Sequence, residues 1–154
     1  MRRQDKEIKD SKIIDFILGD SRICRLGLVD NGEAYIVPVN YAYKDGIIYI
    51  HSAPRGRKMD ILRKNNFVSF EITASEEVIM NELPCEWSAK YRSVMGTGII
   101  ETENNPDAKK AGLDLIMRKY GATGELRYDE GSVSRMVLLK LRVDSVTGKQ
   151  SGDW

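Results

Sequence analysis

Apolar residues recur at regular spacings along the chain, and these spacings predict its elements. In SKIIDFILGD the apolar positions lie on one face of a short helix, with Ser11 as its N-cap and Gly19 at its end. Residues 21–52 predict three strands, because DNGE and KDG contain the Asn-Gly and Asp-Gly pairs that are typical of hairpin turns. Two hairpins in succession predict an antiparallel meander.

The middle of the chain mixes helix and strand patterns. MDILRKN predicts a short helix that ends near Asn65, and NFVSFEIT returns to the composition of a strand. The segment ASEEVIMNELPCEWSAKY has no clear period and predicts a loop, with a short strand around residues 78–80. YRSVMGTGIIETE predicts a further strand, where glycines at 96 and 98 indicate a bulge or the close approach of another backbone or a ligand.

The last two elements are a helix and a long strand. NNPDAKKAGLDLIMRKYG predicts a helix with Pro106 in its first turn and Gly121 at its end, and SRMVLLKLRVDSVTGK predicts the final strand. This order has too few βαβ alternations for a doubly wound sheet. It favours a mainly β fold, in which a small antiparallel barrel carries helices on its outside and forms one domain over residues 1–154.

Composition and charge narrow the classes of protein. The chain is 42% hydrophobic and 31% charged, as expected for one globular domain, and its net charge of +1 favours neither nucleic acid nor a membrane as partner. No run is apolar enough for a membrane helix or a signal peptide, so we expect a cytoplasmic protein. One histidine and two separated cysteines predict no metal site, and Cys24 alternates with leucines like a core residue.

Pro38, in VPVNYAY, interrupts a strongly β-forming run. Proline cannot donate a hydrogen bond to a neighbouring strand, so it indicates an edge strand or a bulge. An edge strand protected from aggregation is one interpretation. The other is that backbone atoms at residues 38–40, freed from pairing, face a ligand. The segment alone favours the first interpretation.

The segment HSAPRGRK places a serine, a glycine and the cations Arg55, Arg57 and Lys58 where a helix begins. Hydroxyl and ammonium groups at a helix N-terminus suit a phosphate monoester. The alternative is a solvated loop, although cations at a helix N-terminus are mildly unfavourable. That conflict favours an anion site.

Two further features are candidates for chemistry. His51 is the only histidine and lies at a strand end, where it could exchange a proton or simply form a structural hydrogen bond. In CEWSAKYRSVMGTG, Trp87 and Tyr91 stand beside Arg92, a combination that stacks on planar ligands or packs a subunit interface. The GTG glycines are no dinucleotide fingerprint, because the third glycine and the βαβ context are missing.

Taken in order, these segments resemble the flavin-binding split-barrel proteins related to pyridoxamine 5′-phosphate oxidase, in the branch that contains the nitroimidazole-resistance (Nim) proteins. The resemblance runs from MRRQDKEI through CRLGLVDNGEAYIVPVNYAY, IYIHSAPRGRKMDIL, CEWSAKYRSVMGTGIIE and DLIMRKYG to TGKQSG. It implies a six-stranded antiparallel split β-barrel of the FMN-binding type. Such proteins are usually homodimers with two FMN sites at the subunit interface.

The resemblance also implies which residues hold the cofactor. Residues 37–40 would lie along the isoalloxazine ring, residues 51–52 would approach the ribityl phosphate, and a cation at 57 or 58 would hold the phosphate. The stretch 87–93 would reach the flavin of the partner subunit. His51 is also the candidate proton donor. The implied cofactor-binding residues are Val37, Pro38, Val39, Asn40, His51, Ser52, Arg57, Lys58, Trp87, Tyr91 and Ser93.

The end of the chain departs from the oxidases themselves. Pyridoxamine-phosphate oxidases end in a basic, proline-containing motif that grips the substrate's phosphate, whereas this chain ends in VTGKQSGDW. The resemblance therefore implies an FMN-dependent oxidoreductase that reduces a small planar acceptor, such as a nitroaromatic compound, and not vitamin B6 oxidation. FAD, a deazaflavin or haem are alternative cofactors. A non-catalytic flavin- or haem-binding carrier or sensor is the alternative function, and a dimeric scaffold without cofactor is a third.

Overall fold

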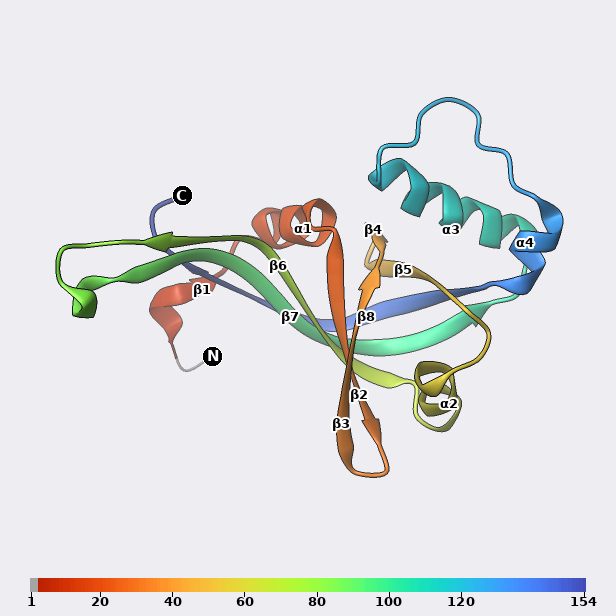
Figure 1. Cartoon of the computed structure of the whole chain (residues 1–154), viewed down its shortest axis with the longest axis horizontal. Helices are drawn as coiled ribbons and strands as arrows, with labels where there is room; N and C mark the ends of the chain where they lie inside the picture. The colour runs from red at the N-terminus through yellow and green to blue at the C-terminus, as the bar shows by residue number, and fades with distance from the viewer. Residues whose placement is uncertain (1–2) are drawn as a thin grey trace.

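The structure is a computed structural model that describes residues 3–154, and Figure 1 shows its elements. The strands are β1 (Glu7–Ile8), β2 (Ile23–Asp30), β3 (Glu33–Asn40), β4 (Ala42–Lys44), β5 (Ile47–Ser52), β6 (Phe67–Ile79), β7 (Ser88–Glu103) and β8 (Val137–Ser151). The helices are α1 (Ser11–Asp20), α2 (Arg57–Lys64), α3 (Pro106–Lys119) and α4 (Glu130–Arg135), with short 3-10 turns at Gln4–Lys6 and Pro84–Glu86.

The strands form a barrel, because a single stretch of chain joins the two ends of the sheet. The strand order is β3-β2-β6-β7-β8-β5-β4, every pairing is antiparallel, and β1 adds to β8. β3 and β4 stand at opposite ends of this order, yet only Tyr41 separates them in the chain. The predicted antiparallel β-barrel is confirmed. The sheet has eight strands and not the expected six. Tyr41 divides the middle strand into β3 and β4, and the two-residue β1 is too short for a sequence pattern to reveal.

Both predicted hairpin turns form, but the predicted meander is wrong at its middle strand. The turn residues Asn31, Gly32, Asp45 and Gly46 all have positive φ, the conformation that tight hairpin turns require. The first part of the middle strand, β3, pairs with β2, and its second part, β4, pairs with β5. The middle strand therefore connects two edges of the barrel and does not lie between two full-length neighbours.

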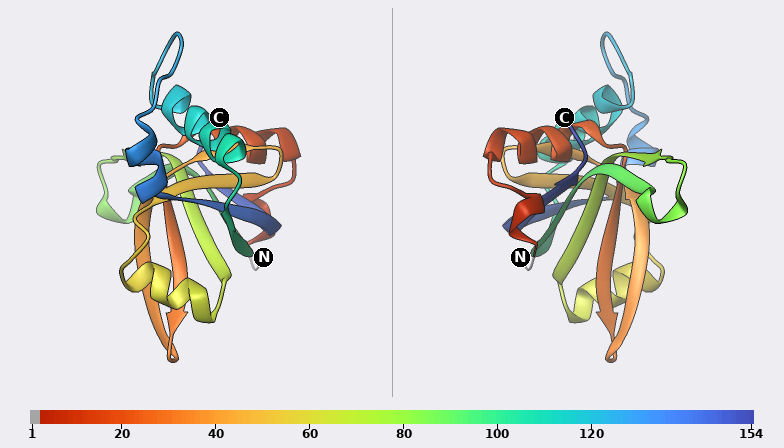
Figure 2. Two further views of the ribbon diagram at one scale, coloured as in Figure 1. Left: turned by 90° about the vertical axis from the view of Figure 1, so that its right-hand side faces the viewer. Right: turned by 90° about the vertical axis from the view of Figure 1, so that its left-hand side faces the viewer.

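The barrel core is apolar, and α1 closes one of its ends. Side chains from five strands are fully buried there, including Leu26, Ile50, Ile72, Val94 and Leu141. Cys24 is buried among them as predicted, and burial raises the pKa of its thiol to about 12. Figure 2 shows α1 and α3 across one end of the barrel and α2 near the other. No helix within residues 3–154 combines the length and apolarity needed to cross a membrane.

Two helix ends differ from the sequence prediction. Asp10, not Ser11, caps α1, because its carboxylate accepts a hydrogen bond from the Lys12 N–H at 2.9 Å, and the helix runs on through Gly19 to Asp20.

The sequence did not predict α4, whose segment EGSVSR is too short and polar to show a period. As a result the last strand begins at Val137, after this helix.

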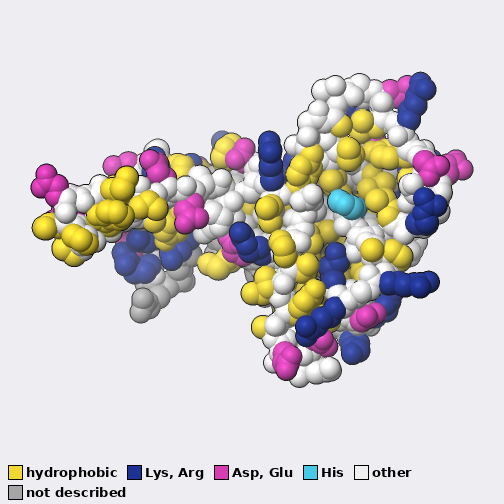
Figure 3. Space-filling view, viewed as in Figure 1, with side chains coloured by type: hydrophobic (Ala, Val, Ile, Leu, Met, Phe, Trp, Pro, Cys, Tyr) yellow, Lys and Arg dark blue, Asp and Glu magenta, His cyan; other side chains and the backbone are white. Residues whose placement is uncertain are grey.

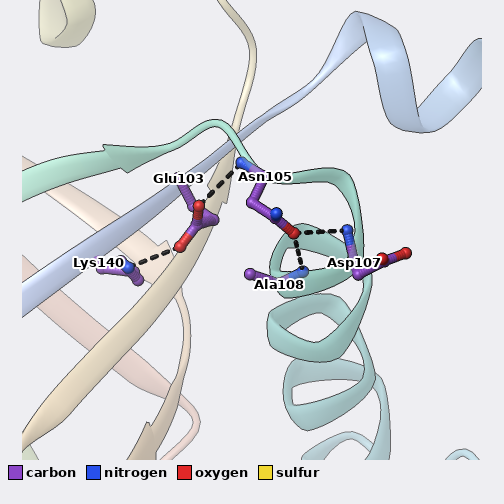
Figure 4. A network of polar contacts seen from close by, with 5 residues as sticks. All are labelled: Glu103, Asn105, Asp107, Ala108 and Lys140. Atoms are coloured by element: carbon purple, nitrogen blue, oxygen red, sulfur yellow. Dashed lines mark hydrogen bonds and ion pairs between the residues drawn. The ribbon is translucent and has the colours of Figure 1, made fainter.

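The start of α3 is tied to the barrel by a short polar network, shown in Figure 4. The side chain of Asn105 caps the helix by accepting hydrogen bonds from the N–H groups of Asp107 and Ala108, each at 3.0 Å. Glu103 accepts a bond from the Asn105 N–H and pairs with Lys140 of β8 at 2.6 Å. These bonds lower the pKa of Glu103, the bond from Lys140 most of all, so the carboxylate stays charged and holds α3 in place.

The predicted loop over residues 74–91 is largely wrong, because β6 and β7 continue as a two-stranded arm beyond the barrel (Figure 1). The ladder pairs Glu76 with Tyr91 and Ile79 with Ser88. A ribbon outside the barrel has no face on the core, so its sequence lacks the alternation that identifies a half-buried strand. The arm ends in a tip with exposed apolar side chains at Val78, Met80 and Leu83.

The glycines of β7 lie where two backbones approach closely, as the sequence predicted. The register between β7 and β8 shifts between Thr97 and Gly98, which marks a bulge. A Cβ atom at Gly96 would lie 2.3 Å from the Ser145 carbonyl oxygen and 2.5 Å from the ring of Phe70. Neither neighbour can move without opening the sheet or the core.

We therefore expect Gly96→Ala to lower the free energy of unfolding by about 2–3 kcal/mol, because the added methyl overpacks the site. The matched control is Gly19→Ala in α1, where a Cβ meets nothing within 4 Å. That change should stabilise the protein by about 0.5 kcal/mol, since alanine is the better helix former. Urea denaturation of both variants measures the difference. Equal effects at the two positions would contradict the close approach.

Candidate functional site

The segment between β5 and α2 forms an open helix start. Gly56 is the N-cap of α2 and has φ 115°, a conformation that favours glycine. It has no side chain to accept from the helix, and within the described chain the N–H groups of Arg57, Lys58 and Met59 have no hydrogen-bond acceptor. The first turn therefore presents free donors and the positive end of the helix dipole.

Of the three cations in HSAPRGRK, Arg55 is exposed and precedes the helix, while Lys58 and Arg57 belong to its first turn and differ in their contacts. Lys58 is half-buried, forms no ion pair within residues 3–154, and has a pKa lowered by burial. Arg57 lies 3.1 Å from the Asp30 carboxylate and 4.7 Å from the centre of the Tyr35 ring, so it ties α2 to the β2–β3 hairpin. Lys58 is the better candidate for an external anion.

The side chains of His51 and Ser52 point to opposite sides of β5. The Ser52 side chain is buried, and its hydroxyl donates to the Ala53 carbonyl oxygen at 2.9 Å. His51 is exposed on the outer side of the strand, and Figure 3 shows the histidine beside a patch of apolar side chains. Because side chains alternate along a strand, the two neighbouring residues that the sequence predicted for one site face two different surfaces.

Pro38 lies on an edge strand, as predicted. It stands opposite Arg25 of β2, and within the described chain no strand pairs with the other edge of β3. The side chains of Val37 and Val39 pack on the core, while Pro38 and Asn40 point outward. The free backbone edge at residues 37–40 is thus available to a partner molecule.

The aromatic stretch lies on the arm, away from α2 (Figures 1 and 2). Trp87 is half exposed, and its indole N–H donates to the Asn81 carbonyl oxygen at 2.8 Å. The ammonium groups of Lys6 and Lys149 lie 5.8 and 5.5 Å from the centre of the Tyr91 ring. Ser93 lies deeper in the same strand. One chain therefore does not bring these residues to the start of α2.

The sequence did not reveal a shallow depression on the outer face of the sheet. Its volume is about 610 Å³, and β2, β3, β6, β7 and β8 line it. Ile36 and Met95 expose apolar surface there, and Arg25 pairs with Glu71 at 2.9 Å. The sequence did contain a signal for this surface. Ile36 and Met95 alternate with core residues along their strands, so their side chains must face outward.

Lys119, at the end of α3, places its ammonium against the bend between β3 and β4, a contact that the sequence also did not reveal. The Lys119 ammonium lies 3.4 Å from the centre of the buried Tyr41 ring and has no hydrogen-bond partner in the described chain. Burial lowers the pKa of Lys119 to about 8, although the nearby Asp20 carboxylate opposes this shift. The aromatic face offsets part of the cost of burying the charge.

The fold described above is a split β-barrel with an edge strand, an open helix start and a projecting arm. The model of the pyridoxamine 5′-phosphate oxidase family matches residues 10–150. The chain therefore belongs to that family. A search of curated proteins finds no match.

A solved structure supports the same family. A protein from Bacteroides thetaiotaomicron, named as a candidate 5-nitroimidazole antibiotic resistance protein, is 30% identical with a TM-score of 0.84, over 93% of this chain and 85% of that one. This match places the chain in the nitroimidazole-resistance branch, as the sequence predicted.

Two more distant structures share the fold. An FAD- and haem-binding protein from Mycobacterium smegmatis is 23% identical with a TM-score of 0.85, over 97% of this chain and 75% of that one. A flavocytochrome from Azotobacter vinelandii is 17% identical with a TM-score of 0.85, over 99% of this chain and 72% of that one. At these identities the likeness establishes the architecture alone.

The buried lysine generates a prediction about pH. The pKa of Lys119 is about 8 in the folded protein against an ordinary 10.5, so the unfolded chain binds more protons between these two values. Below pH 8 the folded state carries the full cost of the buried charge. Lys119→Met should therefore stabilise the protein at pH 7, and this advantage should shrink as the pH rises from about 8 towards 10.5.

Denaturant titrations of wild type and variant across that pH range measure the effect. Lys12→Met is the control, because Lys12 is an exposed lysine on α1 and its substitution should give no such pH dependence. A Lys119→Met advantage that stays constant from pH 7 to 10.5 would show that the ammonium is fully solvated.

Proposed function

We propose that the chain binds FMN, with the flavin phosphate at the start of α2, and acts as an oxidoreductase that reduces small planar acceptors such as nitroaromatic compounds. The observation that carries the proposal is the open first turn of α2, with free N–H donors beside the unpaired, half-buried Lys58. The named relatives that bind flavin or haem support a cofactor of this kind.

A phosphate would offset three unfavourable features of this helix start at once. It would accept hydrogen bonds from the free N–H groups, and its charge would match the positive end of the helix dipole. It would also pair with Lys58, whose burial otherwise disfavours the ammonium. Arg57 would support the site indirectly, by holding α2 against the β2–β3 hairpin.

The free edge of β3 is the proposed seat of the isoalloxazine ring. Backbone groups at residues 37–40 would hydrogen-bond the polar edge of the ring. His51 is the proposed proton donor, because its imidazole is exposed and has no hydrogen bond in the described chain. When bound, a flavin takes electrons from a donor and passes them to an acceptor.

The proposed active form is a homodimer. Trp87 and Tyr91 lie on the arm, remote from the α2 of their own chain, and Ser93 lies next to it in β7, so these residues would serve the flavin site of the partner. Aromatic and cationic side chains of this kind are common at subunit interfaces.

Lys58→Ala should weaken FMN binding about tenfold to a hundredfold, because it removes a charged hydrogen-bond donor from the phosphate. The matched control is Lys64→Ala, an exposed lysine in the last turn of the same helix. Riboflavin, which lacks the phosphate, should bind wild type and Lys58→Ala equally. Quenching of flavin fluorescence measures all of these affinities. If Lys58→Ala leaves FMN affinity unchanged, the phosphate lies elsewhere.

The redox role has its own test. The FMN-loaded protein should lose its flavin absorbance on addition of NADPH under anaerobic conditions, and a 5-nitroimidazole should restore it. Stopped-flow absorbance spectroscopy measures both phases, with free FMN as the control. Tight binding of FMN without reduction by NADPH or NADH would instead support a flavin carrier or sensor.

A further inference from the structure

The pairing between β2 and β3 ends at an inserted side chain. The last pair of this ladder is Ile23 with Asn40. The next residues to face each other are Arg22 and Tyr41. The hydroxyl of Tyr120, at the end of α3, lies between their backbones: it donates to the Arg22 carbonyl oxygen and accepts from the Tyr41 N–H at 3.4 Å. A side chain from another element therefore takes the place of the next backbone hydrogen bond.

The alternation along β3 indicates which of its backbone groups face the free edge. In an antiparallel pair, successive residues alternate between bonding to the neighbouring strand and not bonding to it. Pro38 has no N–H and fits a position without bonds to β2, and Asn40 is two residues further on. The Tyr41 N–H points towards β2, in agreement with the same alternation. The backbone N–H and carbonyl of Asn40 therefore point to the free edge.

One peptide group links these two residues. The carbonyl of Asn40 and the N–H of Tyr41 belong to the same planar unit, and in a trans peptide they point in opposite directions. Because the Tyr120 hydroxyl holds the Tyr41 N–H on the β2 side, it also directs the Asn40 carbonyl oxygen to the free edge. The hydroxyl thus fixes the direction of an acceptor that it does not touch.

The end of α3 gives this hydroxyl a fixed place. The Tyr120 N–H donates to the Met117 carbonyl oxygen at 3.1 Å, and Gly121, with φ 101°, turns the chain away from the helix. The preceding residue, Lys119, packs its ammonium on the ring of Tyr41. Two successive residues of α3 therefore hold Tyr41, one by its backbone and one by its ring.

An acceptor at this edge matters to the proposed flavin. The polar edge of an isoalloxazine ring carries a single N–H, at nitrogen N3, between two carbonyl groups. This N–H needs an acceptor when the ring leaves water. The Asn40 carbonyl oxygen can accept from it, and a rotation of the peptide group would break that bond.

We propose that Tyr120 is a positioning residue for the flavin ring: its hydroxyl orients the peptide group between Asn40 and Tyr41 so that the Asn40 carbonyl oxygen accepts from the flavin N3–H. The inference rests on the proposed flavin site at β3. Tyr120 does not contact the ring in this arrangement, because its hydroxyl lies on the β2 side of the peptide group.

Tyr120→Phe tests the role, because it keeps the aromatic ring and removes only the hydroxyl. The probes are FMN and 3-methyl-FMN, which has no N3–H, and quenching of flavin fluorescence measures both affinities on the full-length protein. Tyr120→Phe should weaken FMN binding about fivefold to tenfold. It should leave 3-methyl-FMN affinity unchanged, since that ligand has no N3–H bond to lose. A general loss of structure would weaken both ligands alike.

Tyr43→Phe is the matched control. It removes a tyrosine hydroxyl that donates to the Asp15 carboxylate at 2.9 Å, on β4 beyond the bend, and it should bind both ligands like wild type. In the unliganded protein, NMR should show that the Tyr41 amide exchanges its hydrogen at least about tenfold faster in Tyr120→Phe but not in Tyr43→Phe. Thermal denaturation checks that both variants remain folded.

Three results would overturn the role of Tyr120. They are equal FMN affinity in wild type and Tyr120→Phe, equal weakening of FMN and 3-methyl-FMN, and unchanged exchange of the Tyr41 amide. If wild type binds neither ligand, the proposed function fails and this role fails with it. If wild type binds FMN and Tyr120→Phe binds it equally well, only the role of Tyr120 is wrong.

Discussion

The bend at Tyr41 is the constraint on which the rest of the structure depends. The chain leaves its pairing with β2 just before this residue and pairs with β5 just after it, and this change of partner closes the barrel. The buried Tyr41 fixes the bend, because its hydroxyl donates to the Leu18 carbonyl oxygen at 2.8 Å and its ring packs under Lys119. The change of partner also leaves one edge of β3 unpaired, so closure of the barrel and exposure of the candidate flavin edge have one cause.

At the end of β5, two neighbouring residues place their side chains on different surfaces. Strand alternation sends Ser52 inward, next to the turn that leads to α2, and His51 outward, under α3 and α4. The polar network at Glu103 and Asn105 holds α3 in the position where it forms one wall of an apolar pocket beside His51. Residues that are adjacent in sequence therefore have different surroundings, and a substitution at one need not affect the other.

Local sequence chemistry was a good guide to several element ends. The hairpin turns, the end of α2 at Asn65 and the start of α3 at Pro106 follow from residue types whose backbone preferences act within a few positions. The strands over residues 74–91 were predicted as a loop because the arm has no face on the barrel core, so no alternating burial pattern marks it. Of the candidate site, HSAPRGRK was identified as a helix start, but the engagement of Arg57 by Asp30 depends on a hairpin far away in the chain.

The sequence by itself determined the mainly β class, the edge position of Pro38, the close approach at Gly96 and the resemblance to a family, because these depend on residue types and short spacings. Only the tertiary structure decided that Lys58 is free of the ion pairs that engage Arg57, that the arm residues lie far from their own α2, and that His51 opens onto an apolar pocket. The physical reason is that each of these facts depends on which distant side chain or strand fills the neighbouring space. That choice is made by barrel closure at Tyr41 and by the packing of α3 and α4, which no local pattern encodes.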